Sequence, residues 1–93
     1  MDNKQRVSSG YINVGSLYLK QGKNSLALDY CQRSLTLAEE ISDLSGQKSA
    51  CNCLYEAHKA MGNGNKALEF MEKMRVIEDS LNSEETSKKL QQM

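Results

Sequence analysis

Shifting this chain by forty residues places residues of the same kind on one another. The shift keeps glycine on glycine, alanine on alanine and apolar residues on apolar residues, in the pairs Gly22/Gly62, Ala27/Ala67, Leu28/Leu68, Tyr30/Phe70, Val14/Leu54, Leu37/Ile77 and Ile41/Leu81. A period in this range is typical of solenoids, in which one supersecondary unit stacks on the next. The repeat therefore predicts one helical hairpin written twice.

Composition restricts the repeated unit to helices. The 93 residues include no proline and no tryptophan, and the good helix formers Ala, Leu, Lys, Glu, Gln and Met are plentiful. We expect an all-α fold of two helical hairpins, a fragment of an α-solenoid, plus a C-terminal helix. Twelve basic and twelve acidic side chains cancel, so the chain lacks the positive field that attracts nucleic acid. No nucleic-acid partner is expected.

The sequence also bears on membrane association and cellular location. No stretch approaches the roughly 20 apolar residues of a membrane span, so we expect no membrane contact by this segment. The three cysteines, Cys31, Cys51 and Cys53, are an odd number without a secretory signal before them. A disulfide framework is therefore not expected, and a cytoplasmic location is predicted.

We expect the chain to form a single domain. Turn residues divide this domain into two repeats, over about 5–44 and 45–82. We expect helices over about 3–21, 24–42, 47–61 and 65–81. Asn24 is expected to cap the second helix, and turns are expected at 43–46 and 62–65. Asn82 and Glu85 have the spacing of a capping box. The C-terminal helix over about 83–93 is therefore either separate or a continuation of the fourth.

Apolar residues at helical spacing predict one buried face on each helix. On the first two helices these residues are Val7, Tyr11, Val14, Gly15 and Tyr18, then Leu26, Ala27, Tyr30, Cys31, Ser34, Leu35, Leu37, Ala38 and Ile41. On the last two they are Ala50, Cys51, Leu54, Ala57, His58 and Met61, then Ala67, Leu68, Phe70, Met71, Met74, Ile77 and Leu81. The small residues among them allow neighbouring helices to approach closely.

These residues resemble the tetratricopeptide repeat family. Its hairpin pattern is matched in the first unit by Tyr11, Val14, Gly15, Tyr18, Gly22, Ala27, Tyr30, Cys31 and Ser34, and more loosely in the second by Cys51, Leu54, Tyr55, His58, Gly62, Ala67, Phe70, Met71 and Met74. The forty-residue spacing resembles the extended repeats of the family. The resemblance implies a non-catalytic module that binds a protein or peptide partner.

A narrower resemblance concerns the second unit. The runs 54–62, 66–70 and 78–85 look like the last repeat of multi-domain bacterial signalling proteins. In those proteins a repeat array precedes an output domain such as a histidine kinase, a nucleotide cyclase or a transcription regulator. The resemblance implies that this chain is the scaffold or sensory part of such a protein.

Residues with catalytic or metal-binding chemistry do not assemble into a site in the sequence. His58 falls in the buried face and is expected to be a packed or rim-exposed imidazole. Cys51 and Cys53 are about 200° apart on a helix, which prevents them from sharing a metal ion. The run Gly62–Lys66 follows a helix rather than a strand and lacks the ending of a phosphate-binding loop. We therefore expect no enzyme activity, no cofactor and no metal.

The partner-binding groove implied by the resemblance is lined by the first helix of each hairpin. The corresponding residues are Ser9, Ile12, Asn13, Ser16, Leu19, Lys20, Ser49, Asn52, Cys53, Glu56 and Lys59. Ile12 and Leu19 lie seven residues apart and outside the main buried stripe, so they predict an apolar contact with a peptide or another helix. The alternative is that they are single exposed apolar residues at the rim.

Two hairpins leave apolar ends uncovered, because about three repeats are normally needed to bury the faces of a solenoid. Either the tail from Ser83 covers one end or the chain pairs with a copy of itself. We expect a homo-oligomer, in the simplest case a dimer. The alternative function is therefore a self-association module that brings together downstream output domains.

Overall fold

Four α-helices make up the structure, and the described residues contain no strand. The computed structural model describes the backbone of residues 3–91 and the side chains of residues 3–82. In chain order the helices are α1 (Lys4–Lys20), α2 (Asn24–Glu40), α3 (Leu44–Ala60) and α4 (Gly64–Gln91). The all-α class predicted from the sequence is confirmed.

The helices follow one another at a constant interval. They begin at residues 4, 24, 44 and 64, and each of the first three is 17 residues long. A helix of that length extends about 25 Å. Three residues connect each helix to the next. The forty-residue sequence period is therefore made of two helices and two connections of equal length.

Glycines end α1 and α3 in the same way. Gly22 and Gly62 both have φ of 76°, in the left-handed region that glycine adopts without a steric cost. After α1, the Lys23 N–H donates to the Tyr18 carbonyl at 2.8 Å, and the equivalent bond after α3 is also 2.8 Å. This is the hydrogen bond of a Schellman motif, which satisfies carbonyl groups at the helix end.

The middle connection differs from the sequence-based prediction. The turn is centred on Ser42, whose φ is 54°, and α3 begins at Leu44 rather than Gln47. Asp43 caps α3, because its carboxylate accepts a hydrogen bond from the Gly46 N–H at 3.1 Å. Gly46 lies inside the first helical turn of α3, where an added Cβ would come within 2.6 Å of the Asp43 carboxylate. The predicted turn at 43–46 is therefore wrong, because residues 44–46 are helical and the connection is formed by residues 41–43.

Two further expectations about helix ends are corrected. Asn24 is the first residue of α2, and the N-cap position is held by Lys23 without a side-chain hydrogen bond. α4 continues through Asn82 and Glu85 to Gln91. These two residues therefore do not start a new helix, and the C-terminal segment is a continuation of the fourth helix as far as Gln91.

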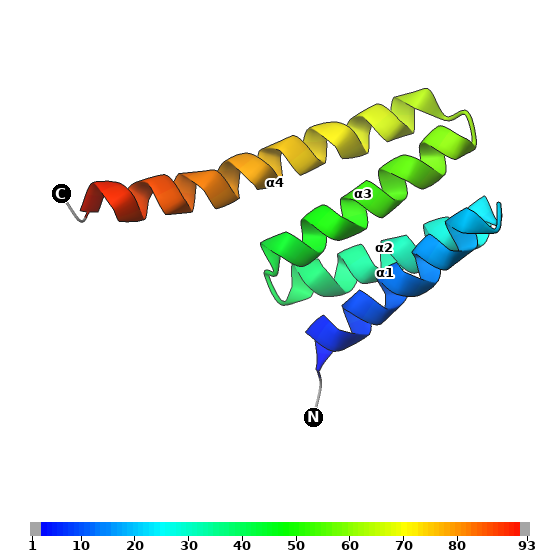
Figure 1. Ribbon diagram of the computed structural model, residues 1–93, viewed down its shortest axis with the longest axis horizontal. Coiled ribbons are helices and arrows are strands. Elements are labelled where there is room, and N and C mark those ends of the chain that lie inside the picture. Colours follow the sequence, from blue (N-terminus) through cyan, green and yellow to red (C-terminus); the bar gives the residue numbers. More distant parts are fainter. Residues whose placement is uncertain (1–2, 92–93) are drawn as a thin grey trace.

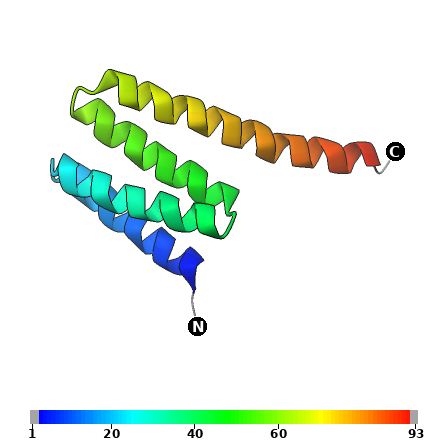
Figure 2. The same ribbon diagram turned by 180° about the vertical axis from the view of Figure 1, so that it is seen from behind.

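Each helix packs against its neighbours in sequence, and α1 also packs against α3. Figures 1 and 2 show α3 between the first hairpin and α4, with α4 extending past the start of α3. α1 is therefore covered by α2 and α3, and α4 is covered by α3. The inner helices α2 and α3 have neighbours on both sides.

The core lies where α2 and α3 meet their neighbours. Its buried residues are mostly small, and they are Ala27, Cys31, Leu35, Ala38, Ala50, Cys51, Cys53, Leu54, Ala57, Ala67 and Ile77. Ser8 and Ser34 are also buried, and the Ser8 hydroxyl donates to the Ser34 carbonyl at 3.0 Å. Small side chains let the helix axes approach closely, as the sequence analysis expected.

Cys31 and Cys53 form a disulfide between α2 and α3. Their Cα atoms are 5.8 Å apart, which lies within the range that a disulfide spans. The sequence analysis did not expect a disulfide, because spacing along the chain does not show which cysteines meet across a helix interface. Gly15 of α1 lies against this pair, since an added Cβ would come within 2.8 Å of the Cys31 sulfur.

Several residues predicted to be buried are exposed. They are Val7, Val14, Leu26, Ile41, Met61, Leu68 and Met71. Val7 and Val14 lie on the outer side of α1, and Leu68 and Met71 lie on α4. The outer helices lack a neighbour on one side, so these four apolar residues remain in solvent. The other three lie at helix ends, with Leu26 in the first turn of α2 and Ile41 and Met61 at the C-caps of α2 and α3.

Candidate interaction surface

An open groove lies between α3 and α4 and has a volume of about 400 Å³. It is lined by residues from both helices, namely Ser45, Lys48, Ser49, Asn52, Met74 and Leu81. We call these six residues the α3–α4 groove. Two of them, Ser49 and Asn52, belong to the groove predicted from the sequence.

The two sides of the α3–α4 groove differ in chemistry. α4 contributes the apolar side chains of Met74 and Leu81, which also pack against the core. α3 contributes hydroxyl and amide groups that can donate and accept hydrogen bonds. At one edge the Lys48 ammonium pairs with the Glu78 carboxylate at 2.9 Å. The groove therefore offers an apolar side and a polar side to a bound chain.

The sequence repeat shows what fills the same position in the first hairpin. Forty residues before Lys48, Asn52 and Met74 are Ser8, Ile12 and Ser34. Ser8 and Ser34 are buried, and Ile12 packs against the core cluster of α2, α3 and α4. The equivalents of the other three groove residues, Gln5, Ser9 and Ile41, are exposed. α3 packs against α1, so it covers part of the first-hairpin surface that corresponds to the groove.

Ile12 and Leu19 do not provide the exposed contact predicted for them. Both are half-buried and pack against the core cluster within this chain. Both side chains contact helices of the same chain, because α1 packs against α3 as well as α2. Their role in binding a separate partner stays a prediction.

The other predicted groove residues are placed differently. Ser16 is half-buried and Cys53 is buried in the disulfide. The exposed residues are Ser9, Asn13 and Lys20 on α1, and Ser49, Asn52, Glu56 and Lys59 on α3. Of these, the groove contains the α3 residues Ser49 and Asn52. The sequence analysis assigned Met74 and Leu81 to the core and so did not place them in the groove.

A second, shallower depression of about 370 Å³ lies over α1 and α2. Its lining residues are Tyr11, Asp29, Gln32, Arg33, Thr36 and Leu37. Arg33 pairs with Asp29 at 3.2 Å and lies over the Tyr30 ring, 5.6 Å from its centroid. The Arg33 side chain is thus engaged within the chain. This depression was not anticipated from the sequence.

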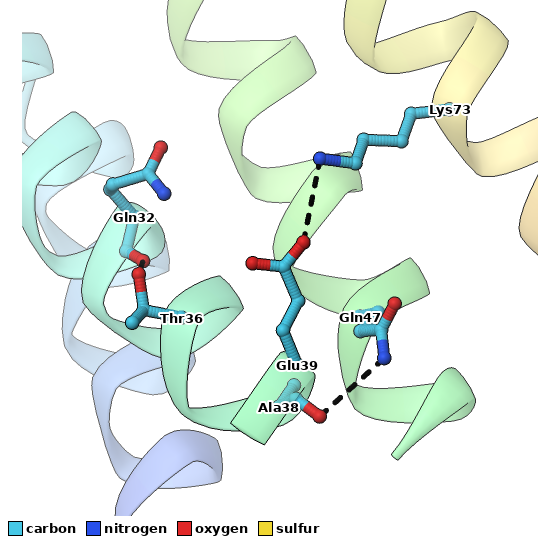
Figure 3. Close-up of polar contacts among 6 residues, drawn as sticks. All are labelled: Gln32, Thr36, Ala38, Glu39, Gln47 and Lys73. Carbon is cyan, nitrogen blue, oxygen red and sulfur yellow. Dashed lines mark hydrogen bonds and ion pairs between the residues drawn. The ribbon is translucent and has the colours of Figure 1, made fainter. Parts of the chain in front are cut away.

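Polar contacts join the two hairpins on the side shown in Figure 3. The Lys73 ammonium of α4 pairs with the Glu39 carboxylate of α2 at 3.6 Å. The Gln47 amide of α3 donates to the Ala38 carbonyl of α2 at 3.5 Å. The Thr36 hydroxyl bonds only within its own helix (Figure 3), to the Gln32 carbonyl at 3.1 Å. Surface ion pairs contribute little stability, so packing holds the hairpins together.

His58 is packed as the sequence analysis expected. Its ring stacks on the Phe70 ring with centroids 5.5 Å apart, and its buried Nδ1 has no hydrogen-bond partner among the described residues. Burial lowers the pKa of His58, and the nearby Lys66 lowers it further. The neutral imidazole therefore joins α3 to α4 by stacking.

The remaining groups considered for metal binding or thiol chemistry are the acidic residues, His58 and the free thiol of Cys51. The described residues hold no group of three or more His, Cys, Asp or Glu residues able to bind a metal ion. Burial raises the pKa of the Cys51 thiol, which disfavours the nucleophilic thiolate.

Comparisons of the chain with protein-family models, with curated proteins and with solved structures find no match. Among the described helices, none combines the length and the apolar character needed to cross a bilayer.

Proposed function

We propose that this chain is a non-catalytic interaction module that receives an α-helix of a partner protein in the α3–α4 groove. The observation that carries the proposal is the repeat itself. Part of the equivalent surface of the first hairpin, at Ser8, Ile12 and Ser34, is buried or half-buried where α1 packs against α3 as well as α2. The groove is the corresponding open surface of the second hairpin. A surface that the chain covers with a helix in one hairpin is suited to a helix in the other.

The groove defines the chemistry of this partner helix. One side of the helix carries an apolar residue that contacts Met74 and Leu81, and methionine adapts to side chains of different shape. The neighbouring turn carries an amide or hydroxyl group that hydrogen-bonds with Ser49 or Asn52. The repeat architecture supports a wider proposal, in which a tetratricopeptide-like module serves as the docking or sensory part of a larger bacterial signalling protein.

A photo-crosslinking amino acid placed at Asn52 tests the groove in the cells that make the protein. Thr36 is the control position, because it is also exposed and lies in the depression of the first hairpin. We expect one discrete crosslinked partner from position 52 and not from position 36. The variant Met74→Glu is expected to abolish that product while circular dichroism stays unchanged.

The proposal fails if neither position yields a product. It also fails if both positions yield the same products, or if Met74→Glu leaves the product from position 52 unchanged. Mass spectrometry of the crosslinked peptide identifies the partner segment. Its helical character is then checked by circular dichroism of the synthetic peptide with the protein.

A further inference from the structure

Three helices meet at the Cys31–Cys53 disulfide. Cys31 of α2 is fully buried, and Cys53 of α3 is 4% exposed. Gly15 of α1 lies against both sulfurs, because an added Cβ would come within 2.8 Å of the Cys31 sulfur and 3.2 Å of the Cys53 sulfur. The α2 backbone is also close, since the Ala27 carbonyl oxygen would lie 3.4 Å from the same Cβ. α1 therefore covers the disulfide at Gly15, where there is no room for a side chain.

The repeat does not place a similar group in the second hairpin. Forty residues after Gly15 is Tyr55, and forty residues after Cys31 is Met71. A glycine inside a helix lowers the stability of that helix, so Gly15 is explained by the two sulfurs that it contacts rather than by the repeated pattern. The disulfide and its glycine thus form one structural unit that joins the first hairpin to α3.

Cys51 of α3 does not compete for this disulfide. It is a buried free thiol, and it lies about 200° from Cys53 around the helix axis. Burial raises the pKa of the Cys51 thiol, and a disulfide is attacked by a thiolate. Exchange within the chain is therefore disfavoured, and the state of the Cys31–Cys53 pair depends on a reductant or an oxidant from outside the chain.

We propose that the Cys31–Cys53 pair is a redox switch that controls how α1 packs. A disulfide bond holds its two sulfurs about 2 Å apart, whereas heavy atoms without a bond between them pack at roughly 3.5 to 4.0 Å. Reduction therefore increases the space that the pair needs, in a protein interior that is already closely packed. Gly15 is in contact with the pair, so the reduced sulfurs push against α1.

Packing decides which helix moves. α2 and α3 have neighbours on two sides and share a buried core that includes Leu35, Ala50 and Leu54. Extra volume in a packed core is accommodated by backbone shifts, and we expect the outer helix α1 to shift. Ile12 and Leu19 of α1 pack against the core cluster that contains both cysteines. Displacement of α1 therefore uncovers these two side chains.

The reductant is a dithiol. One of its thiolates attacks a sulfur of the disulfide, the bond between the protein sulfurs breaks, and a mixed disulfide forms. The second thiol of the reductant then displaces the protein sulfur, so the reductant leaves as a cyclic disulfide. Two electrons and two protons pass to Cys31 and Cys53, which become thiols. Oxidised glutathione reverses the step, because the two protein thiols form a disulfide again and two glutathione thiols are released.

Hydrogen–deuterium exchange of the whole chain, measured by mass spectrometry with and without dithiothreitol, tests the switch. The chain is first treated with oxidised glutathione, after which Cys51 alone among the three cysteines is expected to react with a thiol reagent in denaturant. Reduction is expected to speed exchange in α1 at least about tenfold and in α4 less than about threefold. Circular dichroism is expected to remain that of a folded helical chain.

Matched variants test the mechanism. Gly15→Ala adds a methyl group against the Cys31 sulfur and is expected to speed exchange in α1 of the oxidised chain, whereas Gly10→Ala meets no atom within 4 Å and is not. Cys31→Ala removes the disulfide together with one sulfur. Its α1 is expected to exchange more slowly than that of the reduced unmodified chain and not to respond to dithiothreitol. Cys53→Ala repeats this test from α3, and Cys51→Ala is expected to keep the response.

The inference is overturned if three thiols react in the oxidised chain, because the disulfide then does not form. It is also overturned if reduction changes exchange equally in α1 and α4, if it changes neither, or if it unfolds the whole chain. Exchange in Cys31→Ala and Cys53→Ala that equals that of the reduced unmodified chain excludes crowding by the two sulfurs. The experiment uses no binding partner, so its result is independent of the α3–α4 groove.

Discussion

The two hairpins have matching sequences and different surroundings. Leu54 of α3 is 2% exposed, and Val14, which occupies the same place in α1, is 36% exposed. On the second helix of each hairpin it is the first hairpin that is buried. Cys31 of α2 is fully buried, and its equivalent, Met71 of α4, is 37% exposed. The inner helices α2 and α3 have neighbours on two sides, and the outer helices do not. A repeated pattern therefore fixes which residues can be buried, and the neighbour decides whether they are.

The largest expected effect separates the equivalent positions Leu54 and Val14. Leu54→Ala is expected to lower the free energy of unfolding by about 2 to 5 kcal/mol, because it opens a cavity in the core. Val14→Ala is expected to lower it by less than about 1 kcal/mol. Urea unfolding measures both variants. Equal losses would show that Val14 is buried to the same extent as Leu54.

The glycines of α1 provide a second comparison within one helix. Gly15→Ala is expected to destabilise the chain by about 1 to 3 kcal/mol, because the added methyl group overlaps the sulfur of Cys31. Gly10→Ala meets no atom and is expected to stabilise it by up to about 1 kcal/mol through helix propensity. Thermal unfolding of the two variants distinguishes them. A stabilising Gly15→Ala would contradict the close packing of α1 on the disulfide.

Each of the three connections contains one residue with a positive φ, which is a glycine in the first and third and Ser42 in the second. Ser42→Gly is expected to raise the free energy of unfolding by about 1 kcal/mol, because a serine in the left-handed region is strained and a glycine is not. Gly62→Ser is the matched control and is expected to lower it by a similar amount. Chemical unfolding measures both variants, and opposite signs are required.

The smallest effect concerns His58 and its first-hairpin equivalent, Tyr18. The pKa of His58 is lowered from the ordinary value of 6.5 in the folded chain, so the unfolded chain binds the proton more readily. The free energy of unfolding is expected to be constant above pH 6.5 and to decrease as the pH falls from 6.5 through the lowered pKa. Unfolding midpoints between pH 5 and 8 measure this.

The variant His58→Tyr makes the two hairpins alike at this position. It is expected to lose the part of the pH dependence that falls just below pH 6.5, where the carboxylates titrate little. If the pH profile of His58→Tyr matches that of the unmodified chain, the imidazole does not lose stability on protonation in the folded state.

Much of the fold could be predicted from the sequence, but only part of the candidate site could be. Gly22 and Gly62 marked two of the three connections because glycine at a helix end is a local signal. Ser42 was missed because a serine does not signal a left-handed residue as a glycine does, although the connection closes with the same type of bond, from the Asp43 N–H to the Ala38 carbonyl at 2.9 Å. Ser49 and Asn52 were placed in the groove through their positions on α3. Met74 and Leu81 were missed because apolar residues look alike whether they fill a core or border an opening.

The sequence by itself determined the helices, their forty-residue period and the repeated small residues at their contacts, because these depend on local propensity and periodicity. The tertiary structure decided which apolar residues are buried, that Cys31 meets Cys53, and that Ile12 packs inside the chain while Val14 remains outside. These outcomes depend on which helix lies across each face. The two hairpins repeat one pattern and so have the same apolar faces, but a face is buried only where another helix packs against it.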